Sequence, residues 1–218
     1  MKIYFCRGNV YTTPSILRII LDMKLTLDKE TVILDKIDKV SKYAAKKATN
    51  FIKNLTDEPV KIKTVKVVVV TPEHIKEELE DGGEKIGASV GFSGDIEGIG
   101  ILIFPQKPIP KLMESIGIKR DEVNIENSSN NDEIKEIFSS IISAYLETLV
   151  NFMNTSLNLL SLSFIRGSEK EIAEKLLKNY NNDNVILIFH SELYISDVKS
   201  KFKVLVAIPS KSLIKLSQ

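Results

Sequence analysis

The strongest constraint on this chain is that one pattern of elements is written twice. Two amphipathic helical patterns, in residues 35–55 and 136–156, start roughly one hundred residues apart. Each is followed by apolar, β-type runs that end in a proline, Ile101–Pro105 in the first half and Val204–Pro209 in the second. A duplicated unit packed about a pseudo-twofold axis would place equivalent surface positions in two equivalent sites. The polar faces of the two long helices are therefore the first places to look for function.

Length and composition are those of a soluble globular protein. The 218 residues are 43% apolar and 27% charged, enough to bury a full core. The net charge of +1 gives no general attraction to nucleic acid or to an anionic membrane. The one cysteine, Cys6, cannot form an internal disulfide, and no apolar run reaches the roughly 20 residues of a membrane span. We therefore expect a cytoplasmic protein with no membrane insertion and no nucleic-acid partner.

Hydrophobic periodicity predicts the same order of elements in both halves: helix, strand, helix, strand, strand. The first half is predicted to contain a helix over 29–54, a strand over 60–70, a short acidic helix from Pro72, a hairpin over 86–105 with its turn at Ser93–Gly98, and a short helix over 108–116. The second half is predicted to contain a helix over 132–154, a strand over 157–165, a helix over 168–180, and strands over 184–195 and 200–208. Helices mixed with hairpin-linked strands indicate an α+β fold, with long helices packed on a largely antiparallel sheet.

The halves are predicted to form one domain. The two repeats cover about 29–120 and 132–218, and an Asn- and Ser-rich linker over 121–132 joins them. Residues 1–28 are an N-terminal extension with no counterpart in the second half. This extension should contain a short strand over 1–6 and a helix over 15–23, with Thr13-Pro14 as its start signal.

Both long helices carry acidic and hydroxyl residues at a regular spacing. In the second helix Asp132 is followed by Glu136 and then Ser139, ahead of an Ala-Tyr-Leu stretch at 144–146. In the first helix Asp35 and Asp38 occupy the places of Glu136 and Ser139, and a pair of alanines follows. Without further context such i,i+3 polar pairs on a helix surface are usually only solvated.

These helices and both hairpins together resemble the CheC/CheX family of chemotaxis phosphatases. The segment 92–98, followed by an apolar strand and Pro105, is similar to the first hairpin of that family, and 189–209 is similar to its last hairpin. The resemblance covers about residues 30–216. It implies the pseudo-twofold fold of that family, a CheY-type receiver domain as partner, and a CheD-like deamidase as a second possible partner. No cofactor is expected in this chain, because magnesium would belong to the receiver domain.

The resemblance also implies the site residues. In the family, an Asn enters the active site of the phosphorylated receiver and orients the attacking water, while a Glu contacts a conserved lysine of the receiver. Carried over by position, the catalytic residues here are Asp35, Asp38, Glu136 and Ser139. Of these four residues, only Glu136 has the residue type found in the family. The two positions at which the family has Asn are occupied here by Asp38 and Ser139.

The two replacements predict weak or absent phosphatase activity. Hydrolysis of an acyl phosphate needs a positioned water and neutralised charge. A carboxylate at Asp38 would oppose the approach of the phosphoryl group, and the Ser139 hydroxyl is too short to occupy the place of an amide. A misplacement of about 1 Å can cost on the order of 10²-fold in rate.

Three functions therefore stay open: a weak CheY-phosphate phosphatase, a binding module for receiver or CheD-like proteins, and an assembly module like the FliM middle domain, which has a similar fold without the phosphatase motif.

Two surfaces also allow two interpretations each. The lysines of the first helix either solubilise it or steer it towards an acidic partner. The narrow polar stripe of the second helix suits either close packing or docking; it comprises Glu136, Ser139, Ser140, Ser143, Glu147, Asn151 and Asn154. The two histidines, His74 and His190, have no partner set typical of a metal site.

Overall fold

The computed structural model describes residues 10–12, 27–55, 59–114, 132–181, 183–195 and 198–217. The first half contains β1 (Val10–Thr12), α2 (Leu27–Leu55), β2 (Val60–Val70), the 3-10 helix η1 (Pro72–Glu77), β3 (Lys85–Gly94), β4 (Gly98–Pro105) and α3 (Ile109–Glu114). The second contains α4 (Asp132–Phe152), β5 (Leu157–Gly167), α5 (Glu169–Leu177), β6 (Asn184–Ile195), β7 (Val198–Pro209) and the 3-10 helix η4 (Ser210–Ser217). The predicted α+β class is confirmed, and the helices and strands predicted from residue 29 onward are present.

Two short elements escape the sequence-based prediction. The three-residue strand β1 was not predicted, and it pairs parallel to β2 in an otherwise antiparallel sheet. The terminal helix η4 was not predicted either. Asp132 is the first residue of α4, in agreement with the helix predicted over 132–154. The strand predicted over 1–6, the helix predicted over 15–23 and the linker up to 131 lie outside the described residues.

The strands form one sheet in the order β1-β2-β6-β7-β4-β3-β5. Apart from β1, this order is symmetric about its centre. The strands β2 and β5, β6 and β3, and β7 and β4 are counterparts in the two halves, and the members of each pair lie equally far from the centre. The central pair is β4 with β7, where Ile101 lies opposite Leu205. The pairing is therefore the one that a pseudo-twofold arrangement of the halves requires, although duplication of the sequence itself stays a prediction.

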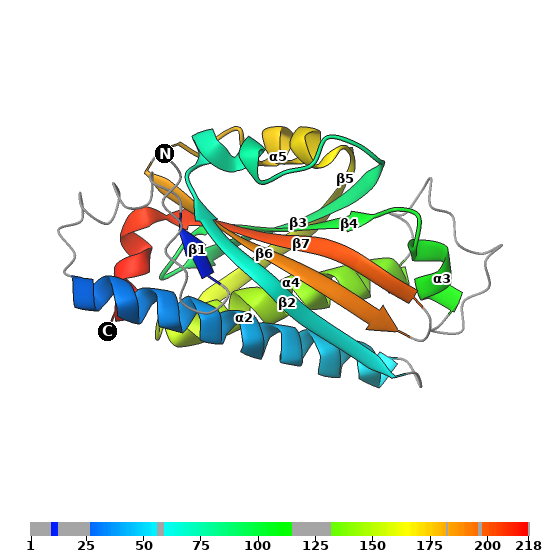
Figure 1. Cartoon of the computed structure of the whole chain (residues 1–218), viewed down its shortest axis with the longest axis horizontal. Coiled ribbons are helices and arrows are strands. Elements are labelled where there is room, and N and C mark those ends of the chain that lie inside the picture. Colours follow the sequence, from blue (N-terminus) through cyan, green and yellow to red (C-terminus); the bar gives the residue numbers. More distant parts are fainter. Residues whose placement is uncertain are drawn as a thin grey trace.

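The sheet is covered on both faces, as Figure 1 shows. Helices α2 and α4 cover one face and bury alternate strand residues such as Val67, Phe104 and Phe189. Helix α5 and η1 cover the other face and bury the intervening residues, among them Val68 and Ile188. Because successive strand residues point to opposite faces, strands buried on both sides have nearly continuous apolar runs. The unbroken Val67–Val70 run in β2 has this origin.

The long helices follow from their apolar periodicity. Helix α2 buries residues spaced three and four apart, namely Ile33, Ile37, Val40, Ala44 and Ala48. Helix α5 starts at a capping box in which the Ser168 side chain accepts a hydrogen bond from the Glu171 backbone N–H and the Glu171 carboxylate accepts one from the Ser168 backbone N–H. Within the described ranges no helix is both long enough and apolar enough to span a bilayer.

Candidate functional site

The two predicted site segments lie at opposite ends of an antiparallel helix pair. Helices α2 and α4 run in opposite directions beneath the sheet in Figure 1. The Lys47 ammonium forms an ion pair with the Glu147 carboxylate, and the Tyr43 and Phe152 ring centroids are 5.8 Å apart. Residues further towards the start of each helix therefore lie progressively further apart. Asp35 lies beside Asp38 on α2, and Glu136 lies beside Ser139 on α4, but the two pairs are far from each other.

The first segment, here called the α2 ridge, consists of Asp35 and Asp38. Asp35 is exposed. The Asp38 side chain is only 18% exposed, and its Oδ2 accepts a hydrogen bond of 2.5 Å from the Lys42 ammonium. Its Oδ1 is buried and has no hydrogen-bond partner among the described residues. The Asp38 carboxylate is thus held against its own helix, while Asp35 is free to meet another molecule.

The second segment, here called the α4 ridge, consists of Glu136 and Ser139. Glu136 is exposed and Ser139 is half-buried. The Ser139 hydroxyl donates a hydrogen bond of 3.1 Å to the Glu136 backbone carbonyl one turn earlier. A serine hydroxyl that bonds back to its own helix is not directed outward. The α4 ridge therefore presents a carboxylate and, at the position where the family has an amide, a hydroxyl already in use.

The exposed acidic groups of the ridges are carboxylates. The described residues contain no group of three or more His, Cys, Asp or Glu side chains that could hold a metal ion. Each ridge does offer one exposed carboxylate, Asp35 or Glu136, on a long, well-supported helix. An exposed carboxylate on a rigid helix can pair with a cation of a docked protein.

A buried cluster of hydroxyl groups joins α4 to the sheet. The Tyr145 hydroxyl lies 3.1 Å from Thr64 Oγ1 and 2.9 Å from Ser191 Oγ, so that three elements meet there: α4, β2 and β6. Burial raises the pKa of Tyr145, and the hydrogen bonds to Ser191 and Thr64 partly oppose that shift. Tyr145 belongs to the Ala-Tyr-Leu stretch that resembles the family, and the structure gives it the role of fixing α4 to the sheet.

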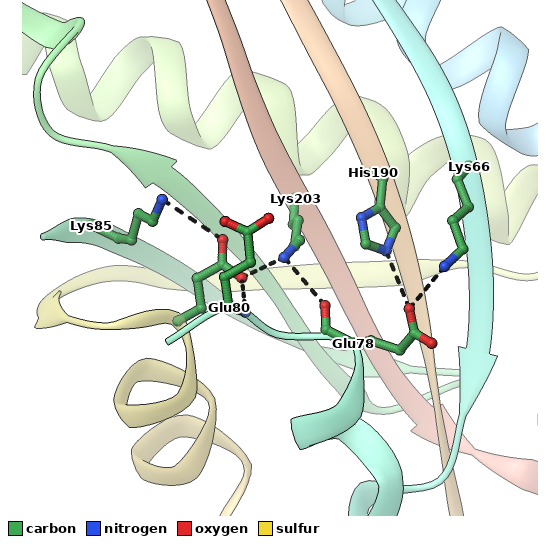
Figure 2. Close-up of polar contacts among 7 residues, drawn as sticks. Lys66, Glu78, Glu80, Lys85, His190 and Lys203 are labelled. Carbon is green, nitrogen blue, oxygen red and sulfur yellow. Dashed lines mark hydrogen bonds and ion pairs between the residues drawn. The ribbon is translucent and has the colours of Figure 1, made fainter. Parts of the chain in front are cut away.

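The structure also contains a polar cleft that was not predicted from the sequence. The cleft lies on the face of the sheet covered by α5 and η1, opposite the ridges. Lys66, His190 and Lys203 are cross-strand neighbours on β2, β6 and β7 and form one row across three strands (Figure 2). Lys85 and Glu169 also belong to its charged wall. We call this site the lysine cleft.

The lysine cleft is built from charges that are largely removed from water. The Lys203 and Glu169 side chains are 9% and 7% exposed, and they form an ion pair. The Glu169 carboxylate also accepts a hydrogen bond of 2.9 Å from the Glu80 backbone N–H. The Glu78 carboxylate accepts one of 2.9 Å from Lys66, and its Oε2 lies 4.0 Å from His190 Nε2. The Lys203 and Lys66 ammonium groups thus each have a carboxylate partner, as the burial of charge requires.

The signal that could have revealed the cleft is the position of lysines inside buried strands. Lys203 stands directly before the apolar run Val204–Ile208, and Lys66 directly before Val67–Val70. Each lysine lies inside a predicted strand, over 60–70 and over 200–208, and the sequence does not show which residues of other strands lie beside it. Only the pairing of β2 with β6 and of β6 with β7 places both lysines beside His190.

Comparison with known proteins rests on structure. No protein-family profile and no curated protein matches this sequence significantly. Thermotoga maritima FliY matches with a TM-score of 0.65 at 16% identity, over 88% of this chain and 95% of the FliY chain. The FliM middle domain of Vibrio alginolyticus matches with a TM-score of 0.54 at 13% identity, over 83% and 96%. H. pylori FliM, solved in a complex with FliG, matches with a TM-score of 0.56 at 12% identity, over 84% and 97%.

These matches define the class of fold: the chain is built like FliY and the middle domain of FliM. The sequence-based prediction of a CheC/CheX-like fold, to which the FliM middle domain is similar, is thereby confirmed. At these identities the likeness concerns the fold, and the function must be argued from the site.

Proposed function

We propose that this chain is a CheC-like chemotaxis signalling protein that contacts a phosphorylated CheY-type receiver domain through the α2 and α4 ridges, with hydrolysis weak or lost. The observation that carries this proposal is that each ridge has one exposed carboxylate and one side chain that is hydrogen-bonded within its own helix. Asp35 and Glu136 are exposed, whereas the Asp38 carboxylate and the Ser139 hydroxyl are bonded within their own helices. The contact positions are therefore available, and the water-orienting positions are not.

Charge on α2 supports the same partner. Several exposed lysines follow the α2 ridge along the helix: Lys39, Lys42, Lys46, Lys47 and Lys53. Two of them are paired, Lys42 with Asp38 and Lys47 with Glu147. A receiver active site is acidic, so a mostly basic helix would accelerate encounter in a salt-dependent way.

The contact is tested by binding of this protein to a CheY-type receiver with and without a small phosphodonor. Glu136→Lys should weaken the complex by about tenfold or more, because it replaces an attraction by a like-charge repulsion at the interface. Glu174→Lys is the matched control, since Glu174 lies on α5, across the sheet from the ridges. Equal affinity of Glu136→Lys and the wild type, or an equal loss in both variants, would contradict the proposed contact surface.

Turnover is tested separately by the decay of the phosphorylated receiver. The wild type should change this decay little. Ser139→Asn, and Asp38→Asn as its companion, should accelerate it by roughly tenfold or more, because each restores a neutral amide that can orient water. Ser143→Asn, on the same polar stripe of α4 but off the motif, should have no effect. If neither motif variant gains activity, the residue-by-residue transfer from the family fails.

A second candidate is a non-enzymatic assembly module of the flagellar switch. The likeness to a FliM chain solved together with FliG favours it. A CheD-like deamidase is a further partner to include. Co-purification against a receiver, a CheD-like protein and FliG separates these possibilities. Selective capture of FliG, without the receiver, would replace the first proposal by the second.

A further inference from the structure

The lysine cleft is a cavity of about 440 Å³ at one end of the sheet face that α5 covers. This volume lies within the usual range for sites that bind small molecules. Besides its charged groups, the cavity wall includes Val65, Pro105 and Phe202. It is therefore larger and more apolar than a site for a lone inorganic ion would need to be.

Two of its polar groups are left without a hydrogen-bond partner. The Lys85 side chain is 15% exposed, and its nearest charged partner among the described residues is Glu169 Oε1, 4.0 Å away, beyond hydrogen-bond distance. His190 Nε2 is buried and makes no hydrogen bond to any described residue. Buried polar groups in native proteins nearly always have partners, so the unpaired His190 Nε2, in one cavity with an ammonium that makes no hydrogen bond to a carboxylate, points to a missing partner.

The charge in the cleft indicates the sign of the missing partner. The Lys66 ammonium has the Glu78 carboxylate at 2.9 Å and the Lys203 ammonium forms an ion pair with Glu169, whereas the Lys85 ammonium has no carboxylate within hydrogen-bond distance among the described residues (Figure 2). Three further charged residues lie at the wall: exposed Glu80, Lys201, and Glu192, which accepts a hydrogen bond from Tyr194 and lies 3.8 Å from Lys199. The partner that the Lys85 ammonium lacks is therefore an anion within hydrogen-bond distance.

The pKa of His190 is also affected by the neighbouring lysines. Burial, together with the positive charges of Lys203 and Lys66, lowers the pKa of His190 to about 3. The imidazole is therefore neutral near pH 7, and the Glu78 carboxylate at 4.0 Å does not reverse the shift. A neutral imidazole in a positive cavity can donate one N–H to an anion.

We propose that the lysine cleft binds a small organic anion whose carboxylate or phosphate group accepts hydrogen bonds from the Lys85 ammonium and from His190 Nε2. The organic part of the ligand lies against the apolar wall. The site is independent of the receiver contact, because it opens on the opposite face of the sheet from the ridges.

The test is an NMR titration of the full chain at constant ionic strength. The probes are inorganic phosphate, succinate and glucose 6-phosphate, with sodium chloride as the control. Saturable shifts of the backbone amides of β2, β6 and β7 around the cleft are expected with at least one organic probe. Saturation by succinate alone assigns a carboxylate ligand, and saturation by glucose 6-phosphate alone assigns a phosphate ligand. Absence of saturation with every probe up to about 10 mM, an affinity of under about 3 kcal/mol, overturns the proposal.

Variants of Lys85 connect the binding to the cleft. Lys85→Gln removes a charged donor and should weaken binding by about tenfold or more. Lys85→Arg keeps the charge and should bind within about threefold of the wild type. Lys76→Gln is the matched control, because Lys76 pairs with Glu174 on the same side of the sheet but outside the cleft. If Lys85→Gln binds as well as the wild type, the anion lies elsewhere and the assignment is wrong.

Discussion

Replacement of Tyr145 by Phe tests how α4 is held over the sheet. The Tyr145 side chain is completely buried, and its hydroxyl has two partners, Thr64 at 3.1 Å and Ser191 at 2.9 Å. Loss of two buried hydrogen bonds would cost about 2 kcal/mol at the average of about 1 kcal/mol each. Part of this cost is recovered, because the Thr64 and Ser191 hydroxyls lie 3.3 Å apart and can still bond to each other.

The expected loss of unfolding free energy is therefore about 1–2 kcal/mol. For a chain of this length it corresponds to a fall in Tm of roughly 3–6 °C. Urea denaturation followed by circular dichroism measures the free energy, and a thermal scan measures Tm. Ser191→Ala in a double-mutant cycle with Tyr145→Phe should show a coupling of about 0.5 kcal/mol or more, because the two hydroxyls share one cluster.

Tyr43→Phe is the matched control, since it removes the same atom from a side chain that is 59% exposed. Its effect should stay within about 0.5 kcal/mol. The reasoning is refuted if both tyrosine variants lose the same stability, or if Tyr145→Phe is as stable as the wild type. In either case the hydroxyl cluster would not be what fixes α4.

Two further predictions concern the sheet. Gly98→Ala should lower the unfolding free energy by about 2 kcal/mol or more, as measured by urea denaturation. The reason is that the added Cβ would lie 2.2 Å from the Ala207 carbonyl oxygen of the neighbouring strand. A variant as stable as the wild type would show that β4 and β7 can move apart at no cost in stability. His190 has a folded-state pKa of about 3, below its ordinary 6.5, so the unfolded chain binds more protons between these values and stability should fall as pH is lowered through this window. His190→Gln should flatten that slope in denaturation curves measured between pH 6.5 and 4, and an unchanged slope would mean that other groups cause it.

Much of the fold follows from local sequence. The apolar spacing in α2 and the continuous Val67–Val70 run predict helix and strand correctly, because periods of 3.6 and 2 are properties of neighbouring residues. The Ser168 cap and the Ser93–Gly98 turn are equally local. Where β1 and η4 were missed, the segments are short and carry too few periodic residues to be recognised.

Part of the candidate site can likewise be predicted from the sequence, and part cannot. The spacing of Asp35, Asp38, Glu136 and Ser139 is visible in the sequence, and so is the exposure of a polar helix face. The partners of the side chains are not visible, because one helix can orient a hydroxyl outward or back to its own carbonyl. The structure shows Ser139 bonded to the Glu136 carbonyl and Asp38 bonded to Lys42, while the catalytic role of these residues stays a prediction.

The sequence by itself determined the order of elements, the class of fold and the residues of the two ridges. Tertiary structure alone decided that the ridges lie at opposite ends of an antiparallel helix pair, and that Lys66, His190 and Lys203 form one row. The physical reason is strand register. Residues more than a hundred positions apart become neighbours only when the strands pair, and a shift of one residue would turn each of those side chains to the other face.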